Sequence, residues 1–408
     1  MSRLEPFRGL RPPRELVREI AAPPYDVVNR TEAERMAKGN PRSFFHVSRP
    51  EIDLGPHVDE HDDAVYAKGR ENLELFVREG WLRRELQPHF YLYRQTMGAH
   101  VQTGLVAAAS VEEYDRNLIL KHELTRADKE DDRTRHVDEL GGNDEPVFLT
   151  YRARKDIDAL VAEGTSQPPE YDFESDDGVK HTFWVVPVAL GERLRGAFAN
   201  GVEKLYIADG HHRSAAASRV RKLRRERGQN TRGQDHFLTV VFPHDQMQIL
   251  DYNRVVKDLN GLDEAAFFAR VSEKFELEEA PDKKPGRARE FRFYLGGKWR
   301  SLRAKGGSYP ETPVGRLDVS ILQQNLLAPV LGIGDPRTDK RIQFVGGIRG
   351  VGELEKLVDS GEYRIAFAMH PTSLEELMAI ADAGEIMPPK STWFEPKLRS
   401  GLVLHPFE

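Results

Sequence analysis

The sequence predicts a mixed α/β protein, and three observations support this prediction. Apolar runs of strand length alternate along most of the chain with stretches in which apolar residues recur at helical spacing. The 408 residues are 39% hydrophobic, which suffices for a sizeable core and favours two or three domains. No repeat of fixed period and no low-complexity tail interrupts the alternation.

The N-terminal part, residues 1–115, is expected to form an α/β unit. Thr31 and Glu34 form a candidate capping box for a short helix that ends near Gly39. The stretch 43–54 resembles an extended strand, and apolar residues at helical spacing predict a helix over 61–82. Two further apolar runs predict strands over 89–97 and 101–111.

Residues 116–247 are expected to form the catalytic core, and residues 248–408 a C-terminal α/β unit that completes the site. The charged stretch 118–140 predicts a helix, and a second helix begins near His212. Thr372 and Ser373, followed by two glutamates, predict the start of the last helix. Strands are expected over 146–153, 181–188, 204–209, 236–243 and 290–297.

Composition excludes several function classes. The formal net charge of −6 gives no overall attraction to nucleic acid or to an acidic membrane surface. No apolar run approaches the roughly 18–20 residues that span a bilayer, and no secretory signal pattern opens the chain. We therefore expect a cytoplasmic protein. The chain has no cysteine, so any metal must be bound by oxygen or imidazole.

The stretch "LYIADGHHRSAAA" places chemically active side chains where a strand meets a helix. Gly210 permits a sharp turn after Asp209, and the N–H groups of the following helix would then face outward with the positive end of its dipole. Arg213 suits phosphate oxygens, His211 and His212 can donate hydrogen bonds, and Asp209 could hold a divalent cation. The alternative is a plain capped turn with packed histidines.

A second polar cluster follows the apolar "LIL" of residues 118–120. Glu123 there ends a short strand, as Asp209 does, so the two carboxylates could supply a base and a metal ligand. His122, Arg126 and Lys129 are candidate phosphate ligands. The alternative is a solvated helix face.

Two further clusters are candidates for substrate binding. One lies in residues 43–54, which are expected to be extended. The alternative to substrate binding there is that its arginine and its glutamate only form an ion pair with each other. The other lies in a proline-bracketed turn near the C-terminus. The candidates are His46, Arg49 and Glu51 in the first cluster, and Lys390, Ser391 and Trp393 in the second.

Five motifs, in order, resemble the bacterial and archaeal domain of unknown function 1015 family: "AAPPYDVV", "NPRSFFHVSRPEIDL", "KHELTRADKEDDR", "LYIADGHHRSAAA" and "MPPKSTWFEPKLRSGL". The resemblance covers nearly the whole chain. It implies a ParB-like core of the kind used by free-serine kinases, with extra N- and C-terminal units. It also implies a pyrophosphate-dependent kinase that converts L-serine to O-phospho-L-serine.

The resemblance assigns roles where the motifs match. Asp209 corresponds to the aspartate at the reacting hydroxyl and Mg²⁺, and Gly210 to Arg213 correspond to the phosphate-binding turn. Glu123 is the best match to the glutamate base, and Glu145 is its rival. Arg49 and Glu51 are candidate anchors for the serine.

Other functions remain open at this point. An ATP- or ADP-dependent small-molecule kinase would need the same residues. A ParB-like nucleotide-dependent DNA-binding or regulatory protein would use the basic run Arg219–Arg227 on the DNA backbone, although nucleic acid is an unlikely partner for an acidic chain. A metal-dependent hydrolase would use Asp209, His211 and His212. The sequence does not set the oligomeric state or the direction of the reaction.

Overall fold

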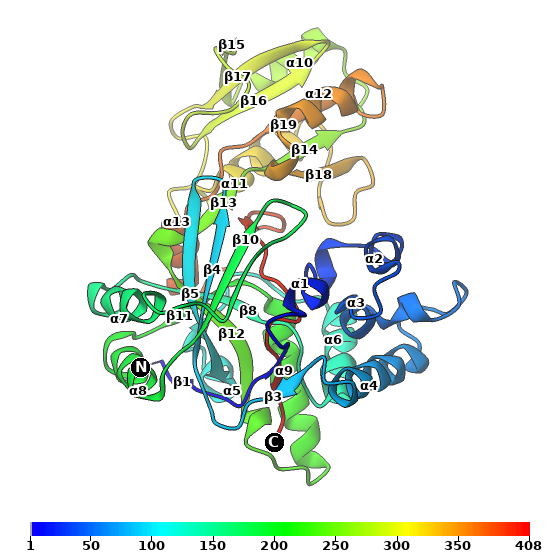
Figure 1. The fold of residues 1–408 in the computed structure, drawn as a ribbon. Coiled ribbons are helices and arrows are strands. Elements are labelled where there is room, and N and C mark those ends of the chain that lie inside the picture. The colour runs from blue at the N-terminus through cyan, green and yellow to red at the C-terminus, as the bar shows by residue number, and fades with distance from the viewer. Residues whose placement is uncertain (1) are drawn as a thin grey trace. The chain divides into compact units, whose positions relative to one another are not determined.

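The computed structural model describes residues 2–408 and has the predicted mixed α/β fold (Figure 1). The chain forms two compact units, and each is described here by itself. The first comprises Met1–Met247 together with Pro396–Glu408, and the second comprises Gln248–Glu395. Within residues 2–408, no helix is both long enough and apolar enough to cross a membrane.

A nine-stranded sheet organises the first unit. Its strands run in the order β6-β11-β8-β12-β5-β4-β10-β9, and β1 pairs with β5. Strand β11 is parallel to β6 and antiparallel to β8, whereas β8 and β12 are parallel. The strands are β1 (Leu4–Glu5), β4 (Tyr91–Met97), β5 (His100–Ser110), β6 (Ile119–Leu120), β8 (Val147–Tyr151), β9 (Tyr171–Glu174), β10 (Lys180–Val185), β11 (Leu205–Asp209) and β12 (His236–Pro243).

Helices surround this sheet, and the main core lies between them and its apolar strands. The helices are α1 (Val17–Ile20), α2 (Arg30–Ala37), α3 (Phe45–Ser48), α4 (Asp63–Arg78), α5 (Val111–Asp115), α6 (Ala127–Leu140), α7 (Lys155–Thr165), α8 (Val188–Gly201) and α9 (His211–Glu226). Two short strand pairs add β2 (Leu10–Arg11) with β3 (Arg83–Arg84), and β7 (Gly142–Asn143) with β21 (His405–Pro406). Single 3₁₀ turns lie at Tyr25–Val27, Pro50–Asp53, Gly233–Asp235 and His244–Gln246.

A six-stranded antiparallel sheet, in the order β15-β17-β16-β19-β14-β18, forms the second unit. Its strands are β14 (Tyr252–Val256), β15 (Phe275–Glu279), β16 (Glu290–Leu295), β17 (Lys298–Ala304), β18 (Ile342–Gly346) and β19 (Ile365–Ala368), with a separate pair of β13 (Gln248–Leu250) and β20 (Trp393–Glu395). Its helices are α10 (Glu264–Val271), α11 (Asp318–Leu322), α12 (Val351–Asp359) and α13 (Leu374–Asp382), with a π turn at Gln323–Leu327 and a 3₁₀ turn at Gly347–Arg349.

The prediction of an extended segment over 43–54 is wrong. This stretch forms helix α3 and a 3₁₀ turn, because Phe44, Phe45 and Val47 pack around one helical turn into a buried cluster. Short apolar runs carry too little periodicity to separate the two structures. The first capping box is also displaced, since Asn29 and Glu32 form it.

Several other predicted elements are confirmed, but the helix expected over 118–140 covers only Ala127–Leu140, because strand β6 and a loop precede it. The two strands expected over 89–97 and 101–111 form β4 and β5, and the helix expected over 61–82 is α4. Ser373 caps α13 in a capping box with Glu376. Strands from both sides of residue 115 share one sheet, and the chain after residue 395 returns to the first unit. The three expected units, with boundaries at residues 115 and 247, therefore remain a prediction.

Candidate functional site

The site begins where β11 delivers Asp209 to the start of α9. The pairing of β11 with β8 shifts in register between Ile207 and Asp209, which marks a bulge at the strand end. Gly210 follows with φ of 95°, and α9 begins at His211. The structure thus contains the predicted strand, turn and helix, with the helix N-terminus next to a carboxylate.

Gly210 is favoured mainly by its backbone conformation, and the space for a side chain there is tight. A Cβ atom here would lie 3.3 Å from Nε of Arg213 and 3.4 Å from Cα of Val147. The backbone N–H of Gly210 also donates to Oδ1 of Asp209 at 2.8 Å, which fixes the carboxylate against the turn. A side chain at residue 210 would therefore strain the turn that positions Asp209.

We expect Gly210→Ala to destabilise the protein more than Gly228→Ala. Gly228 also has positive φ but has no atom within 4 Å of its Cβ position, so alanine there should cost about 1–2 kcal/mol from conformation alone. Gly210→Ala should cost up to about 1 kcal/mol more, because the new methyl group would lie 3.3 Å from Nε of the buried Arg213, which must shift slightly. Urea unfolding measures the stability of both variants. Equal losses of unfolding free energy would show that the contacts around residue 210 add no cost to the alanine.

Two cations hold the carboxylate of Asp209. Nζ of Lys397 donates to its Oδ2 at 2.9 Å, and a guanidinium nitrogen of Arg213 lies 3.9 Å from its Oδ1. Burial would raise the pKa of Asp209, but Lys397 and Arg213 outweigh it and hold that pKa well below the usual value. Asp209 is therefore ionised at neutral pH, with 29% of its side chain exposed.

Arg213 is the most constrained cation of the site. It donates to the backbone carbonyl of Pro146 and pairs with Asp26 at 3.3 Å, and only 9% of its side chain is exposed. Two acids and a carbonyl thus orient the guanidinium beside Asp209.

A small pocket lies at this junction. Its polar lining consists of Asp209, Arg213, Lys397 and Ser400, and Phe148 and Leu398 contribute apolar walls. Its free volume is about 10 Å³, room for about one water molecule, and lies far below the roughly 300–1,000 Å³ of pockets that take drug-sized ligands. The charged lining suits a small anion, which the pocket must widen to admit.

The two histidines of α9 bind the loop that precedes α6. Nε2 of His211 accepts the backbone N–H of His122 at 3.4 Å, and Nε2 of His212 accepts the backbone N–H of Arg126 at 3.1 Å. Both rings therefore fasten residues 122–126 to the N-terminus of α9. Their expected phosphate contacts stay a prediction.

His122 itself is buried against His211. The two ring centroids lie 4.5 Å apart and the rings are nearly perpendicular. Burial lowers the pKa of His122 to about 4, although Asp209 opposes this shift, and burial and His122 lower the pKa of His211 well below its usual value. Both rings are therefore neutral at pH 7.

The two candidate bases have different surroundings. Glu123 is 45% exposed, and its Oε2 lies 3.8 Å from Nδ1 of His211. Glu145 is buried, and its Oε1 accepts hydrogen bonds from Tyr25 N at 2.9 Å and from Ser400 Oγ at 2.8 Å. Burial and the neighbouring Asp144 raise the pKa of Glu145 to about 7.

Other residues predicted for the site have partners outside the pocket or lie exposed. Arg126 pairs with Asp128 at 2.7 Å and is 71% exposed, and Lys129 lies exposed in the first turn of α6. His46 pairs with Asp53 at 2.8 Å.

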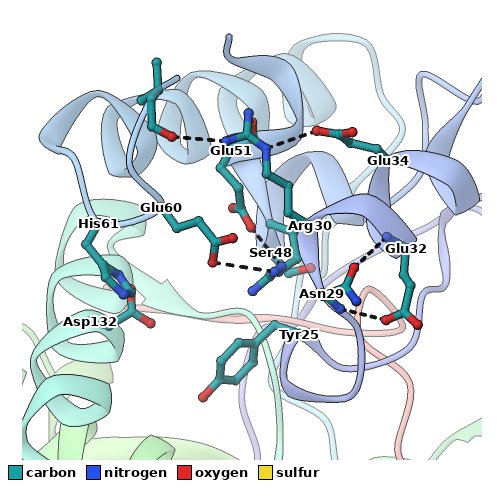
Figure 2. A network of polar contacts seen from close by, with 12 residues as sticks. Tyr25, Asn29, Arg30, Glu32, Glu34, Ser48, Glu51, Glu60, His61 and Asp132 are labelled. Carbon is teal, nitrogen blue, oxygen red and sulfur yellow. Dashed lines mark hydrogen bonds and ion pairs between the residues drawn. The ribbon is translucent and has the colours of Figure 1, made fainter. Parts of the chain in front are cut away.

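Arg49 and Glu51 form the ion pair that the alternative interpretation expected. Arg49 pairs with Glu51 at 2.9 Å and with Glu60 at 3.8 Å, and Figure 2 shows this polar network near Tyr25. The candidates of the C-terminal turn belong to the second unit, so their role at Asp209 stays a prediction: Lys390, Ser391 and Trp393.

Sequence reasoning missed three polar residues that the fold brings to this site, two of which, Lys397 and Ser400, line the pocket. Asp26 and Ser400 contact Arg213 and Glu145, respectively, and Lys397 contacts Asp209. All three lie inside the first and last of the five motifs, which was the available signal. Their partners are 187–255 residues away in the chain, so no local pattern indicates the contacts.

The arginines of the basic run Arg219–Arg227 form ion pairs with acids of the first unit. Each of its five arginines forms an ion pair with an acid on a neighbouring element: Arg219 with Asp131, Arg221 and Arg225 with Asp235, and Arg224 and Arg227 with Asp138. Paired guanidinium groups release few counterions from a nucleic acid, so these pairs argue against a DNA-binding role for the run.

Three solved structures are similar to this chain at low scores. A free serine kinase in complex with AMP has 15% identity and a TM-score of 0.35, covering 73% of this chain and 92% of its own. A conserved hypothetical protein from Pyrococcus furiosus has 15% identity and a TM-score of 0.33, covering 73% and 95%. SbnI from Staphylococcus aureus, truncated at its C-terminus, has 12% identity and a TM-score of 0.38, covering 72% and 85%.

Sequence comparison gives a firmer relationship. No curated protein matches the chain. The model of one family, described as a protein of unknown function (DUF1015), matches residues 4–320, which is more than half of the 408 residues. The chain therefore belongs to the DUF1015 family.

Proposed function

We propose that this protein is a kinase that transfers a phosphoryl group from pyrophosphate to the hydroxyl of free L-serine. One observation carries the proposal: an ionised carboxylate, Asp209, lies between Lys397 and Arg213 at a helix N-terminus and lines a small pocket. Phosphoryl transfer needs this combination, because its transition state spreads negative charge over several oxygens that cations must neutralise. The motif resemblance supports the choice of serine and pyrophosphate.

In the proposed reaction, the serine oxygen forms a bond to one phosphorus and the bridging P–O bond breaks. Inorganic phosphate leaves, and the hydroxyl proton passes to a carboxylate. Arg213 and Lys397 bind the phosphate oxygens together with the backbone N–H groups at the start of α9. Arg213 is held in place by Asp26, so little side-chain entropy is lost when the anion binds.

Glu123 is a better candidate for the general base than Glu145 because it is more accessible. A general base must reach the proton of the bound substrate, and a favourable pKa matters only after that. Glu123 is half-exposed, whereas the second carboxylate oxygen of Glu145 is buried without a hydrogen-bond partner. We therefore assign proton transfer to Glu123 and a structural role to Glu145.

The carboxylate of Asp209 fits a magnesium ion. Mg²⁺ is commonly bound by one or two carboxylates together with substrate phosphates. Asp209 is ionised and partly exposed, and an ionised carboxylate keeps lone pairs beyond those used by Gly210 and Lys397. Asp209 would hold Mg²⁺ there, and the ion would supply positive charge that neutralises part of the charge on the donor phosphates.

Two observations favour pyrophosphate as the phosphoryl donor. The pocket at Asp209 is small, and the sequence has neither a P-loop nor a kinase glycine-rich loop to bind a nucleoside triphosphate. Pyrophosphate has no base or sugar to accommodate.

Purified protein incubated with L-serine, Mg²⁺ and one donor at a time tests the proposal. We expect O-phosphoserine and inorganic phosphate in equal amounts from pyrophosphate, measured by ³¹P NMR and mass spectrometry. ATP and ADP serve as parallel donors. Product from a nucleotide alone would correct the donor, and the absence of phosphoserine with every donor would refute the kinase assignment.

A further inference from the structure

Three side chains beside the proposed active site have the composition of a transition-metal site. His122, Glu123 and His211 each offer one ligand atom, and these atoms all lie within 4.8 Å of one another. The residues come from the loop after β6 and from the first turn of α9. Two imidazoles and one carboxylate are a ligand set that Zn²⁺ and related divalent ions accept, whereas Mg²⁺ prefers oxygen alone.

His122 gives an independent reason to expect a ligand here. Its side chain is buried, with 2% exposure, and neither ring nitrogen makes a hydrogen bond of good geometry. The carbonyl of Ile207 lies close enough to affect the ring but does not complete such a bond. A buried imidazole without partners costs free energy, and coordination to a metal would remove that cost.

The arrangement needs only small adjustments to close around an ion. Ligand atoms of a tetrahedral zinc site are about 3.3 Å apart, given metal–ligand bonds of about 2.0–2.1 Å. Oε2 of Glu123 and Nδ1 of His211 are already 3.8 Å apart, and Glu123 is half-exposed. Binding through Nδ1 moves the ring proton of His211 to Nε2 and gives up the long 3.4 Å contact from His122 N.

We propose that His122, Glu123 and His211 bind one divalent transition-metal ion of the Zn²⁺ class, leaving a coordination position for water or another ligand. The ion would fasten the loop of residues 121–126 to the start of α9. Where the proposed kinase function holds, it would also occupy Glu123 and so inhibit proton transfer from serine. The binding site itself does not depend on that function.

Titration of the chelator-treated, full-length protein with Co²⁺ tests the site. We expect one equivalent to bind with the visible absorption of a four- or five-coordinate ion, and Zn²⁺ to displace it. Glu123→Ala and His122→Leu should each weaken binding by at least about tenfold, since each removes one ligand. Leucine fills the buried position of residue 122 without an unpartnered polar group, so this variant should stay folded.

His212→Ala is the matched control, because it removes the neighbouring histidine of the same helix turn and leaves the three ligands in place. Its Co²⁺ affinity should stay within about twofold of the wild type. Equal Co²⁺ affinity in wild type, Glu123→Ala and His122→Leu, or only the spectrum of hydrated Co²⁺, would overturn the proposal. Both readouts are spectroscopic, so a protein that phosphorylates nothing would still decide the question.

Discussion

Asp209→Asn is expected to lower phosphoserine formation by about 10³-fold while the protein stays folded. Asparagine keeps the size of the side chain and can still accept the hydrogen bond from Gly210 N. It lacks the negative charge that pairs with Lys397 and that would hold Mg²⁺. Initial rates with serine and pyrophosphate measure the loss, and circular dichroism reports the fold.

Asp138→Asn provides the control for this change. Asp138 pairs with Arg224 at 2.7 Å and with Arg227 at 2.6 Å, so it is also an acid between two cations of the same unit, one of them on α9. The chemical change is the same, but Arg224 lies near the C-terminal end of α9 and Arg227 just after it, far along the helix from Asp209. We expect its rate to stay within about twofold of the wild type. An Asp209→Asn variant as active as Asp138→Asn would remove Asp209 from the chemistry.

The local part of the site could be predicted from the sequence because neighbouring residues build it. An apolar strand that ends in an acid, a glycine and a helical pattern allow few backbone paths, and the structure follows the expected one from Leu205 to Glu226. The same holds for the hairpin of β4 and β5, whose two apolar runs are long enough to indicate strands.

The partners of Asp209 and Arg213 could not be predicted in the same way. Lys397 is 188 residues from Asp209, and Asp26 is 187 residues from Arg213. Such contacts depend on how the two ends of the chain return to the same sheet, which no local periodicity encodes. Residue type alone also left the role of His211 and His212 open, because an imidazole that could donate to phosphate instead accepts a backbone N–H.

The choice of base between Glu123 and Glu145 illustrates a second limit of sequence reasoning. Both glutamates follow or precede an apolar strand, so the local pattern does not separate them, although the motif resemblance favours Glu123. Burial separates them, because Glu145 faces Asp144, Arg213, Asp26 and Arg133 inside the protein whereas Glu123 faces solvent. Substitution by glutamine should therefore mainly change stability at residue 145 and mainly change activity at residue 123.

Glu145→Gln is expected to stabilise the protein at alkaline pH relative to the wild type. Burial and Asp144 raise the pKa of Glu145 from 4.5 to about 7, outweighing Arg213 and Arg133, so the folded state holds this proton more tightly than the unfolded state. The wild type thus loses stability from this group as pH rises from about 4.5 to about 7. The full shift corresponds to about 3 kcal/mol, which is the upper limit of the gain for glutamine.

Urea unfolding of both proteins at pH 5 and pH 8 measures this gain. The difference in unfolding free energy should move in favour of Glu145→Gln between the two pH values, because glutamine does not ionise and its Oε1 can still accept from Tyr25 and Ser400. A difference independent of pH would show that Glu145 is ionised at pH 5 in the folded protein.

Glu123→Gln should leave stability almost unchanged and strongly reduce activity. As a half-exposed residue it should change the unfolding free energy by no more than about 0.5 kcal/mol. Its phosphoserine formation should fall by about 10²–10⁴-fold, since glutamine cannot accept the serine proton. Glu145→Gln should keep most of its turnover. Loss of turnover in Glu145→Gln alone would instead make Glu145 the base and require its carboxylate to become accessible when substrates bind.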